Sequence, residues 1–229
     1  MAGVEEIYRE EFKRRVLAGR PRSLLDVGAG RGAFLKGVKS DINRLVGLEP
    51  NTELVETLQG HGIEAVHGSA ERLPFQDHEF DVVVFSYSPH HLSDWAAALK
   101  EAMRVARHSI EILDSWYDDG VPDQRVAHSL DRWCKEIFRR GGMVNNDSLS
   151  PGAILEPVTG IRGLTYDYVC RRVSAPCALN EVEEKARSLL TRVDNDAGLA
   201  AGLSQILEDA RRFGMSEAGC VQMTIELGK

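Results

Sequence analysis

The chain has 229 residues, of which 43% are hydrophobic and 28% are charged, and its formal net charge is −7. This length suits one large domain with a sizeable apolar core. The acidic balance argues against broad electrostatic capture of nucleic acid, and the longest apolar runs are too short to cross a bilayer. We therefore expect a cytoplasmic protein with neither nucleic-acid nor membrane partners, and its oligomeric state stays open.

The cysteines and the start of the chain fit a reducing compartment. The four cysteines form no C-x-x-C pair, and no histidine lies beside them at metal-ligand spacing. Residues 1–6 include two glutamates and no apolar stretch, so they do not resemble a secretory signal. We expect reduced thiols, no bound metal and a single domain over residues 1–229.

Short apolar runs and helical stripes alternate along the first half of the chain. Helices are expected at residues 1–20, at 31–39, from residue 50 onward, and after a capping Ser93-Asp94 pair. Alternation of this kind is typical of parallel βαβ units. Strands are expected at residues 23–27, 44–49, 63–67, 80–85 and 109–113.

The second half of the chain is less regular. A helical stripe runs through residues 126–137, and residues 141–160, rich in Gly, Asn, Ser and Pro, are interpreted as a loop or mobile lid. Strands are expected at residues 164–173 and 220–227, with two amphipathic helices between them. The whole pattern predicts an α/β fold, with a doubly wound, mostly parallel, seven-stranded sheet and helices on both faces.

The strongest chemical signal is a glycine-rich turn after the first strand. Residues 26–32 read DVGAGRG and lie between the expected strand and the next helix. Glycines allow a tight turn and a close approach of a ligand to the backbone, and a helix N-terminus offers unpaired N–H groups. Two ligand classes use this geometry. Gly28, Gly30 and Ala33 match the fingerprint of a dinucleotide site, and S-adenosylmethionine is the alternative.

Several segments, in order, resemble class I methyltransferases. Residues 26–32 fill the family's first motif, Asp-x-Gly-x-Gly-x-Gly. Residues 68–75, GSAERLPF, are similar to the segment after the third strand in small-molecule methyltransferases, and residues 80–94 end in the His-His-Leu-x-Asp pattern of that branch. The chain lacks the Asn-Pro-Pro-Tyr type signature of enzymes that methylate amino groups of nucleic-acid bases. The resemblance covers about residues 20–116. It implies S-adenosylmethionine as cofactor, S-adenosylhomocysteine as product, and a small-molecule acceptor methylated on O, N or C.

The resemblance also implies which residues contact the cofactor. The carboxylate of Asp26 would lie near the methionine end, and that of Glu49, at the end of the second strand, would accept hydrogen bonds from the ribose hydroxyls. Ser69 stands where the family usually has an Asp that accepts the adenine amino hydrogen, and the N–H of Ala70 offers a further contact. Tyr87 is expected to line the adenine or the acceptor pocket. The expected set is Asp26, Gly28, Ala29, Gly30, Gly32, Glu49, Pro50, Ser69, Ala70, Glu71, Ser86 and Tyr87.

Candidate catalytic residues follow the fourth and fifth strands. His90 and His91 come just after the fourth strand and Asp114 ends the fifth, at the edge where ligands bind in sheets of this kind. A histidine there could deprotonate an acceptor hydroxyl or amine, and the alternative is packing within the loop. Methyl transfer from a sulfonium depends mainly on positioning, so a base is needed only if the acceptor must lose a proton.

The expected division of labour is a cofactor-binding half at residues 20–116, a helix and lid-like insertion at 117–160, and C-terminal strands with two helices at 161–229. The helical and loop elements would cap the acceptor site. Two other functions remain open. Ser69 and the lack of a clear base favour a non-catalytic S-adenosylmethionine-binding or scaffold protein, and the glycine pattern also suits an NAD(P)-dependent oxidoreductase.

Overall fold

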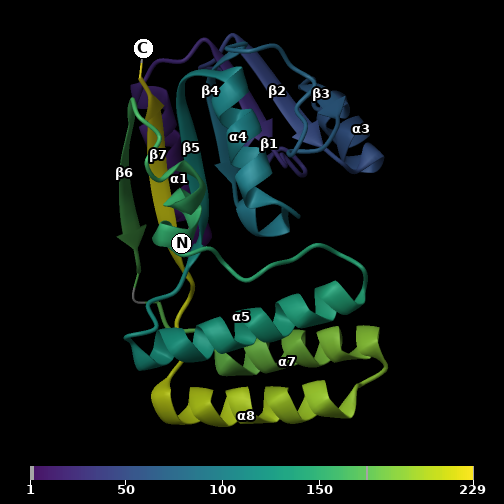
Figure 1. Cartoon of the computed structure of the whole chain (residues 1–229). Coiled ribbons are helices and arrows are strands. Elements are labelled where there is room, and N and C mark those ends of the chain that lie inside the picture. Colours follow the sequence, from purple (N-terminus) through teal and green to yellow (C-terminus); the bar gives the residue numbers. More distant parts are fainter. Residues whose placement is uncertain (1–2, 174, 229) are drawn as a thin grey trace.

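The computed structural model describes residues 3–173 and 175–228. Within these residues, seven strands form one sheet in the order β3-β2-β1-β4-β5-β7-β6 (Figure 1). Each expected strand is present, and the fifth is longer at both ends than the sequence predicts. The strands are β1 (Ser23–Val27), β2 (Arg44–Glu49), β3 (Glu64–His67), β4 (Phe80–Ser86), β5 (Ala106–Trp116), β6 (Leu164–Arg171) and β7 (Gly219–Leu227).

The strand directions confirm a doubly wound, mostly parallel sheet. Strands β3, β2, β1, β4 and β5 run parallel, and β7 runs antiparallel to both β5 and β6. The chain first moves outward from β1 to β3 and then returns to place β4 on the other side of β1. The carboxyl ends of β1 and β4 therefore meet at a topological switch point, which is where open α/β sheets bind ligands.

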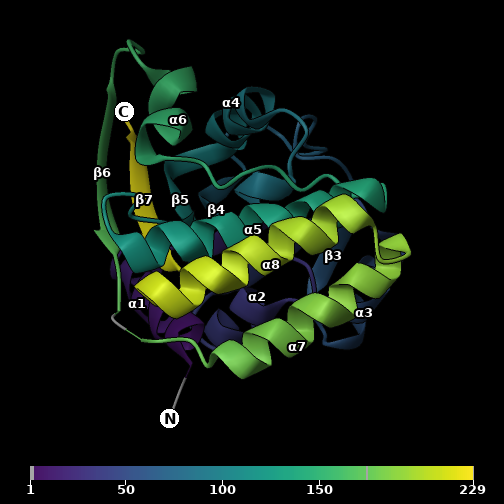
Figure 2. The same cartoon turned by 90° about the horizontal axis from the view of Figure 1, so that it is seen from below.

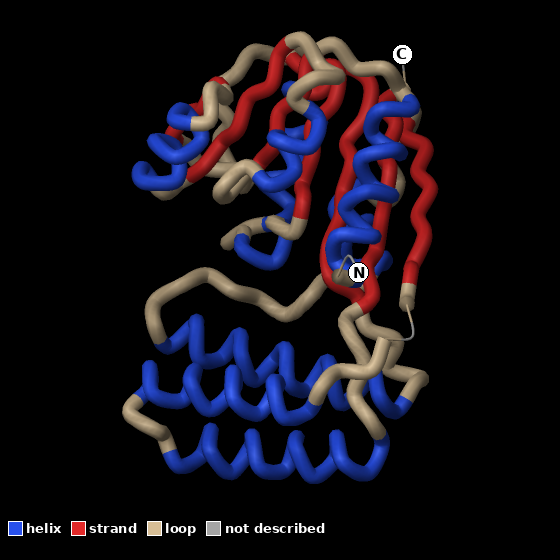
Figure 3. Tube along the Cα trace, turned by 180° about the vertical axis from the view of Figure 1, so that it is seen from behind, coloured by secondary structure: helices blue, strands red, loops and turns tan. Residues whose placement is uncertain are grey.

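Helices cover both faces of the sheet, as predicted (Figures 1 and 3). Along β4, Val82 and Val84 pack with one set of helices while Val83 and Phe85 pack with the other, because successive side chains of a strand point to opposite faces. A strand buried in this way reads as a continuous apolar run. On one face lie α1 (Val4–Ala18), α2 (Ala33–Val38) and α3 (Thr52–Gly60), and on the other lie α4 (Trp95–Val105) and α6 (Pro151–Leu155).

Three further helices form a cap beyond the carboxyl ends of the parallel strands (Figures 1 and 2). They are α5 (Pro122–Arg140), α7 (Leu179–Leu190) and α8 (Ala197–Phe213). The cap has an apolar cluster of its own, in which Trp133 of α5 is buried and donates its indole N–H to the carbonyl of Leu199 at 2.9 Å. None of the helices in the described residues is both long and apolar enough to span a membrane.

The prediction of a loop or lid over residues 141–160 is wrong for residues 151–158. This stretch forms α6 and a 3-10 turn, η2 (Glu156–Val158), and Ile154 is fully buried beside α4. The indole of Trp95 donates a hydrogen bond to the Ile154 carbonyl at 3.0 Å. The polar residues that suggested a loop instead start the helix, since the Ser150 hydroxyl caps it and Pro151 occupies its first turn.

Candidate functional site

A cavity of about 410 Å³ opens at the switch point, between the carboxyl ends of β1, β2 and β4. The structure brings together residues that lie far apart in the sequence but all follow strand ends. Most of the expected cofactor residues line this cavity, which we call the cofactor cavity. They are Asp26, Gly28, Ala29, Gly30, Glu49, Pro50, Ser86 and Tyr87.

Gly28 is required by the geometry of the turn. Its φ is +74°, in the left-handed region, and a Cβ there would lie 2.7 Å from the Cβ of Ser88. The Ser88 hydroxyl donates a hydrogen bond to the Val27 carbonyl at 2.6 Å, which locks the loop after β4 against the end of β1. The glycine therefore brings two strand ends together and leaves backbone open on the cavity side.

Asp26 carries the most unusual electrostatics of the site. Only 1% of this residue is exposed, and within the described part of the chain its Oδ1 has no hydrogen-bond partner. Burial, followed by the negative charge of Glu49, raises the pKa of Asp26 to about 8, although Arg9 opposes the shift. A buried acceptor without a donor is costly, so the site is suited to a ligand that brings a cationic donor.

Glu49 lies at the end of β2 and lines the same cavity. Its Oε1 accepts a hydrogen bond from the backbone N–H of Gly30, so the carboxylate also fixes the glycine turn. Burial raises the pKa of Glu49, and hydrogen bonds from the backbone oppose this effect. Two carboxyl groups, Asp26 and Glu49, therefore face one cavity from neighbouring strands.

Arg9 of α1 is a site residue that the sequence did not reveal. Its guanidinium lies 4.7 Å from the ring centre of Tyr87 and 3.5 Å from the hydroxyl of Ser86, and it also pairs with Glu5. Tyr87 itself has φ of +55°, rare for a tyrosine, which turns the chain sharply as it leaves β4. Further lining residues absent from the expected set are Arg31, Ala33, Phe34, Leu54, Ser88 and Leu92.

Four residues of the expected cofactor set do not line the cavity. A Cβ on Gly32 would lie 2.7 Å from a methyl carbon of Leu58, so this glycine allows α2 and α3 to pack closely. Ala70 is buried in the core, and the hydroxyl of Ser69 donates to the carboxylate of Glu71. Glu71 in turn accepts hydrogen bonds from the residues that begin α4. Their contact with a cofactor stays a prediction.

A second cavity, of about 310 Å³, adjoins the first and shares Tyr87 and His91 with it. We call it the acceptor cavity, after the substrate that the sequence analysis expects beside the cofactor. His90 lines it and bonds through Nδ1 to Oδ1 of Asp114 at 2.7 Å. His91 lies with its Nδ1 3.1 Å from the carbonyl of Val144. The structure therefore brings the predicted catalytic residues together: His91 lines both cavities, His90 lines the acceptor cavity, and Asp114 contacts His90.

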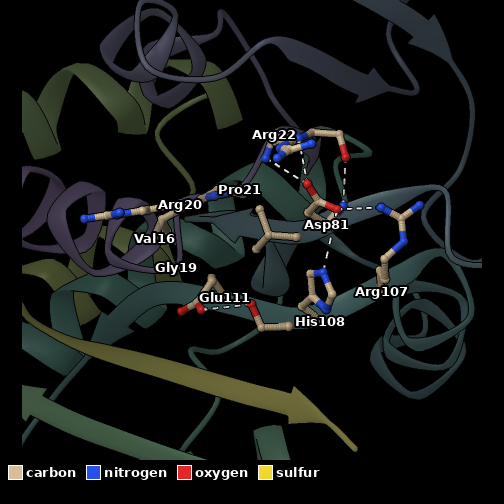
Figure 4. Close-up of a pocket in the computed structure, with 12 residues that line it drawn as sticks. Val16, Gly19, Arg20, Pro21, Arg22, Asp81, Arg107, His108 and Glu111 are labelled. Atoms are coloured by element: carbon tan, nitrogen blue, oxygen red, sulfur yellow. Dashed lines mark hydrogen bonds and ion pairs between the residues drawn. The ribbon is translucent and has the colours of Figure 1, made fainter. Parts of the chain in front are cut away.

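A third cavity, of about 440 Å³, lies at the opposite, amino-terminal edge of the sheet (Figure 4). Its central carboxylate, Asp81, accepts hydrogen bonds from the backbone N–H groups of Arg22 and Ser23 and from the Arg107 guanidinium. These partners satisfy both oxygens, so Asp81 joins three strands rather than awaiting a ligand. Across residues 3–173 and 175–228, no three His, Cys, Asp or Glu side chains are grouped to hold a metal.

Comparison with known proteins identifies the class. Residues 25–109, which include the end of β1, the glycine turn, β2 to β4 and α4, match the family described as a methyltransferase domain. The match covers less than half of the chain, and together with the sheet order and the position of the cavity it supports a class I methyltransferase.

Individual relatives agree with this class. The chain is 34% identical over 115 residues to the uncharacterized methyltransferase YcgJ of Bacillus subtilis (strain 168), covering 46% of each chain. It is 32% identical over 110 residues to the demethylmenaquinone methyltransferase of Bacillus cereus (strain AH187), covering 43% of this chain and 46% of that one. The chain thus aligns with about half the length of these curated relatives. The crystal structure of YcgJ has a similar fold, with a TM-score of 0.66 and 19% identity over 96% of this chain and 99% of that one.

Proposed function

We propose that this protein transfers a methyl group from S-adenosylmethionine to a small-molecule acceptor. The observation that carries the proposal is the buried carboxyl of Asp26, which lines the cofactor cavity beside the Gly28 turn and whose Oδ1 has no hydrogen-bond partner among the described residues. The ammonium of a methionine moiety supplies the cationic donor that this carboxyl lacks. Glu49, at the end of the neighbouring strand, has the chemistry to accept hydrogen bonds from a ribose.

Asp26 also disfavours a nicotinamide dinucleotide. In a dinucleotide site the pyrophosphate sits against the glycine turn and the helix N-terminus. Here that position lies beside Asp26, whose buried carboxyl gains no cationic donor from a pyrophosphate and repels it once ionised. Glu49 does not distinguish the two ligands, because both carry a ribose. A zwitterionic amino-acid end avoids this conflict.

The chemistry of transfer needs little from the protein beyond positioning. S-adenosylmethionine supplies a methyl group already activated on a sulfonium. The residues of the cofactor cavity bind and orient it, and the acceptor cavity adjoins that site through Tyr87 and His91. The printed name of one relative, demethylmenaquinone methyltransferase, supports a small-molecule acceptor.

The test is titration calorimetry of the purified protein with S-adenosylhomocysteine. We expect micromolar binding to the wild type and a loss of at least about tenfold in affinity for Asp26→Ala, because the ammonium loses its charged partner. Asp81→Asn is the control, a buried carboxyl at the opposite edge of the sheet, and it should bind like the wild type. Absence of binding to the wild type would refute the proposal. Binding without methyl transfer to any acceptor would favour a non-catalytic role instead, and binding of NADH would favour the oxidoreductase.

A further inference from the structure

His90 and Asp114 form a pair at the boundary between the sheet and the acceptor cavity. His90 belongs to a short 3-10 turn, η1 (Pro89–His91), directly after β4, and Asp114 lies near the end of the neighbouring β5. Asp114 is fully buried, and its Oδ1 accepts from the backbone N–H of Ser115 at 2.8 Å as well as bonding to His90. Within the described residues, its Oδ2 has no hydrogen-bond partner.

The pairing determines which nitrogen of His90 carries the proton. A carboxylate can only accept hydrogen bonds, so Nδ1 of a neutral His90 must be the donor in the 2.7 Å contact with Asp114. Nε2 then holds a free lone pair. No hydrogen-bond partner for Nε2 occurs in the described part of the chain, and His90 lines the acceptor cavity. The arrangement is therefore that of a base whose orientation is fixed by a buried carboxylate.

His91 is less suited to this role although it lies next to His90. Its Nδ1 faces a backbone carbonyl, that of Val144, and not a carboxylate. Burial, followed by the charge of the His90 imidazole, lowers the pKa of His91, with a smaller contribution from Lys135. The positive charge of a protonated His90 is offset by direct contact with the Asp114 carboxylate. A protonated His91 has no such contact with a carboxylate.

We infer that His90, positioned by Asp114, takes a proton from a phenolic hydroxyl of the acceptor bound in the acceptor cavity. The inference rests on the proposed function, since it concerns the neighbouring half of the same site. A phenolic hydroxyl, with an ordinary pKa of about 10, is acidic enough for an imidazole to assist its ionisation. The resulting phenolate would be attracted to a sulfonium, whereas an ammonium acceptor would bring a second positive charge beside it.

The step balances without any further reactant. The O–H bond of the acceptor breaks, its electron pair stays on oxygen, and the proton forms a new N–H bond at Nε2 of His90. The carboxylate of Asp114 offsets the charge of the imidazolium, which afterwards returns its proton to water. The other titratable groups around this cavity are Glu5, Tyr8, Tyr87, His91 and Glu217.

Ionisation of a bound phenol tests the inference without turnover. The probe is 4-nitrophenol, whose absorbance distinguishes phenol from phenolate, added to protein saturated with S-adenosylhomocysteine at about one pH unit below the probe's own pKa. We expect a several-fold larger phenolate fraction in the wild-type complex than in free solution. His90→Gln should lose this excess. Asp114→Asn should reduce it, because an amide can favour the wrong tautomer. His108→Gln, at the opposite edge of the sheet, should keep it.

A second measurement follows methyl transfer to a series of phenols and a matched series of primary amines. For phenols, His90→Gln should lower kcat by about 10²- to 10⁴-fold with little change in KM, and added imidazole should restore part of the rate. Any of four results would overturn the inference. They are methylation of amines but not phenols, methylation of neither series, no excess phenolate, and a larger loss of kcat in His91→Gln than in His90→Gln. Failure of S-adenosylhomocysteine to bind would instead refute the proposed function.

Discussion

At the scale of single residues, Asp26 combines a proposed role in ligand binding with an energetic cost to the free protein. Burial and the neighbouring Glu49 raise the pKa of Asp26 to about 8, so at neutral pH the carboxyl keeps its proton in the absence of a ligand. A cationic ligand favours the ionised form. Binding must therefore displace a proton from this residue.

Proton release gives the first prediction. Because the ligand binds the ionised form of Asp26, the affinity for S-adenosylhomocysteine should weaken by up to about tenfold for each pH unit below 8. Calorimetry at pH 6.5 to 7.5 in two buffers of different ionisation enthalpy measures both the affinity and the protons released, about one per site. A pH-independent affinity with no proton release would contradict the raised pKa.

The second prediction concerns stability. The folded-state pKa of Asp26, about 8, lies above the ordinary value, so its contribution is most favourable at low pH and is lost as pH rises through the folded-state pKa. Asp26→Asn should raise the free energy of unfolding at pH 8, by on the order of 1–3 kcal/mol, and by less at pH 5. Urea unfolding at both pH values is the measurement. Asp41→Asn, in an exposed turn after α2, is the control that should change neither value.

The sequence predicted the residues of this site that follow strand ends. Asp26 and Glu49 could be assigned because an acidic residue next to a glycine turn, or at the end of the second strand, has few other roles in such folds. Arg9 could not be assigned. Its position depends on how α1 packs on the sheet, and no local pattern in a surface-exposed helix encodes a contact with Ser86 on a strand 77 positions away.

At the scale of elements, periodicity and capping residues were sufficient for the strands and most of the helices. Asp94 was predicted to lie at the start of a helix and does cap α4, accepting from the N–H of Ala97. Residues 151–158 were misassigned because short helices carry no periodic signal, and their Pro, Gly and Ser content also suits a loop. What decides their structure is burial against α4, which is a tertiary effect.

Two substitutions test this assignment. Ile154 of α6 is fully buried, so Ile154→Ala should lower the free energy of unfolding by about 2–4 kcal/mol. Met143, in the preceding non-helical stretch, is 51% exposed, and Met143→Ala should change stability by less than about 0.5 kcal/mol. If chemical denaturation showed the same loss of unfolding free energy for both variants, residues 151–158 would not pack as a core element.

At the scale of the whole molecule, the cap is joined to the site by the stretch that follows α5. The backbone N–H of Asn146 donates to the carbonyl of His90 at 2.7 Å, and its side chain donates to the carbonyl of Leu92 at 2.8 Å. The buried ammonium of Lys135, on α5, holds Ser148 of the same stretch at 2.8 Å. The cap is otherwise packed around its own apolar cluster, so this connection links it to the ligand-binding edge.

This connection predicts how ligand binding spreads. S-adenosylhomocysteine should slow amide hydrogen exchange in residues 86–92 and also, by about threefold or more, in residues 143–148, because the two stretches are hydrogen-bonded. Exchange in α8, the cap helix farthest from the sheet in Figure 1, should not change. Mass-spectrometric exchange with and without ligand makes the comparison. Protection of 86–92 alone would show that the cap is not coupled to the site.

The order of the strands also has a consequence for biosynthesis. The last strand, β7, lies between β5 and β6, and both pair with it along most of their length. Until residues 219–227 leave the ribosome, β5 is an unpaired edge strand and β6 lacks the strand with which it pairs. A nascent chain therefore completes its cofactor-binding strands early, yet exposes an unpaired strand throughout the synthesis of the cap. Its vulnerability to aggregation should be greatest in that interval, which makes it a candidate for chaperone assistance.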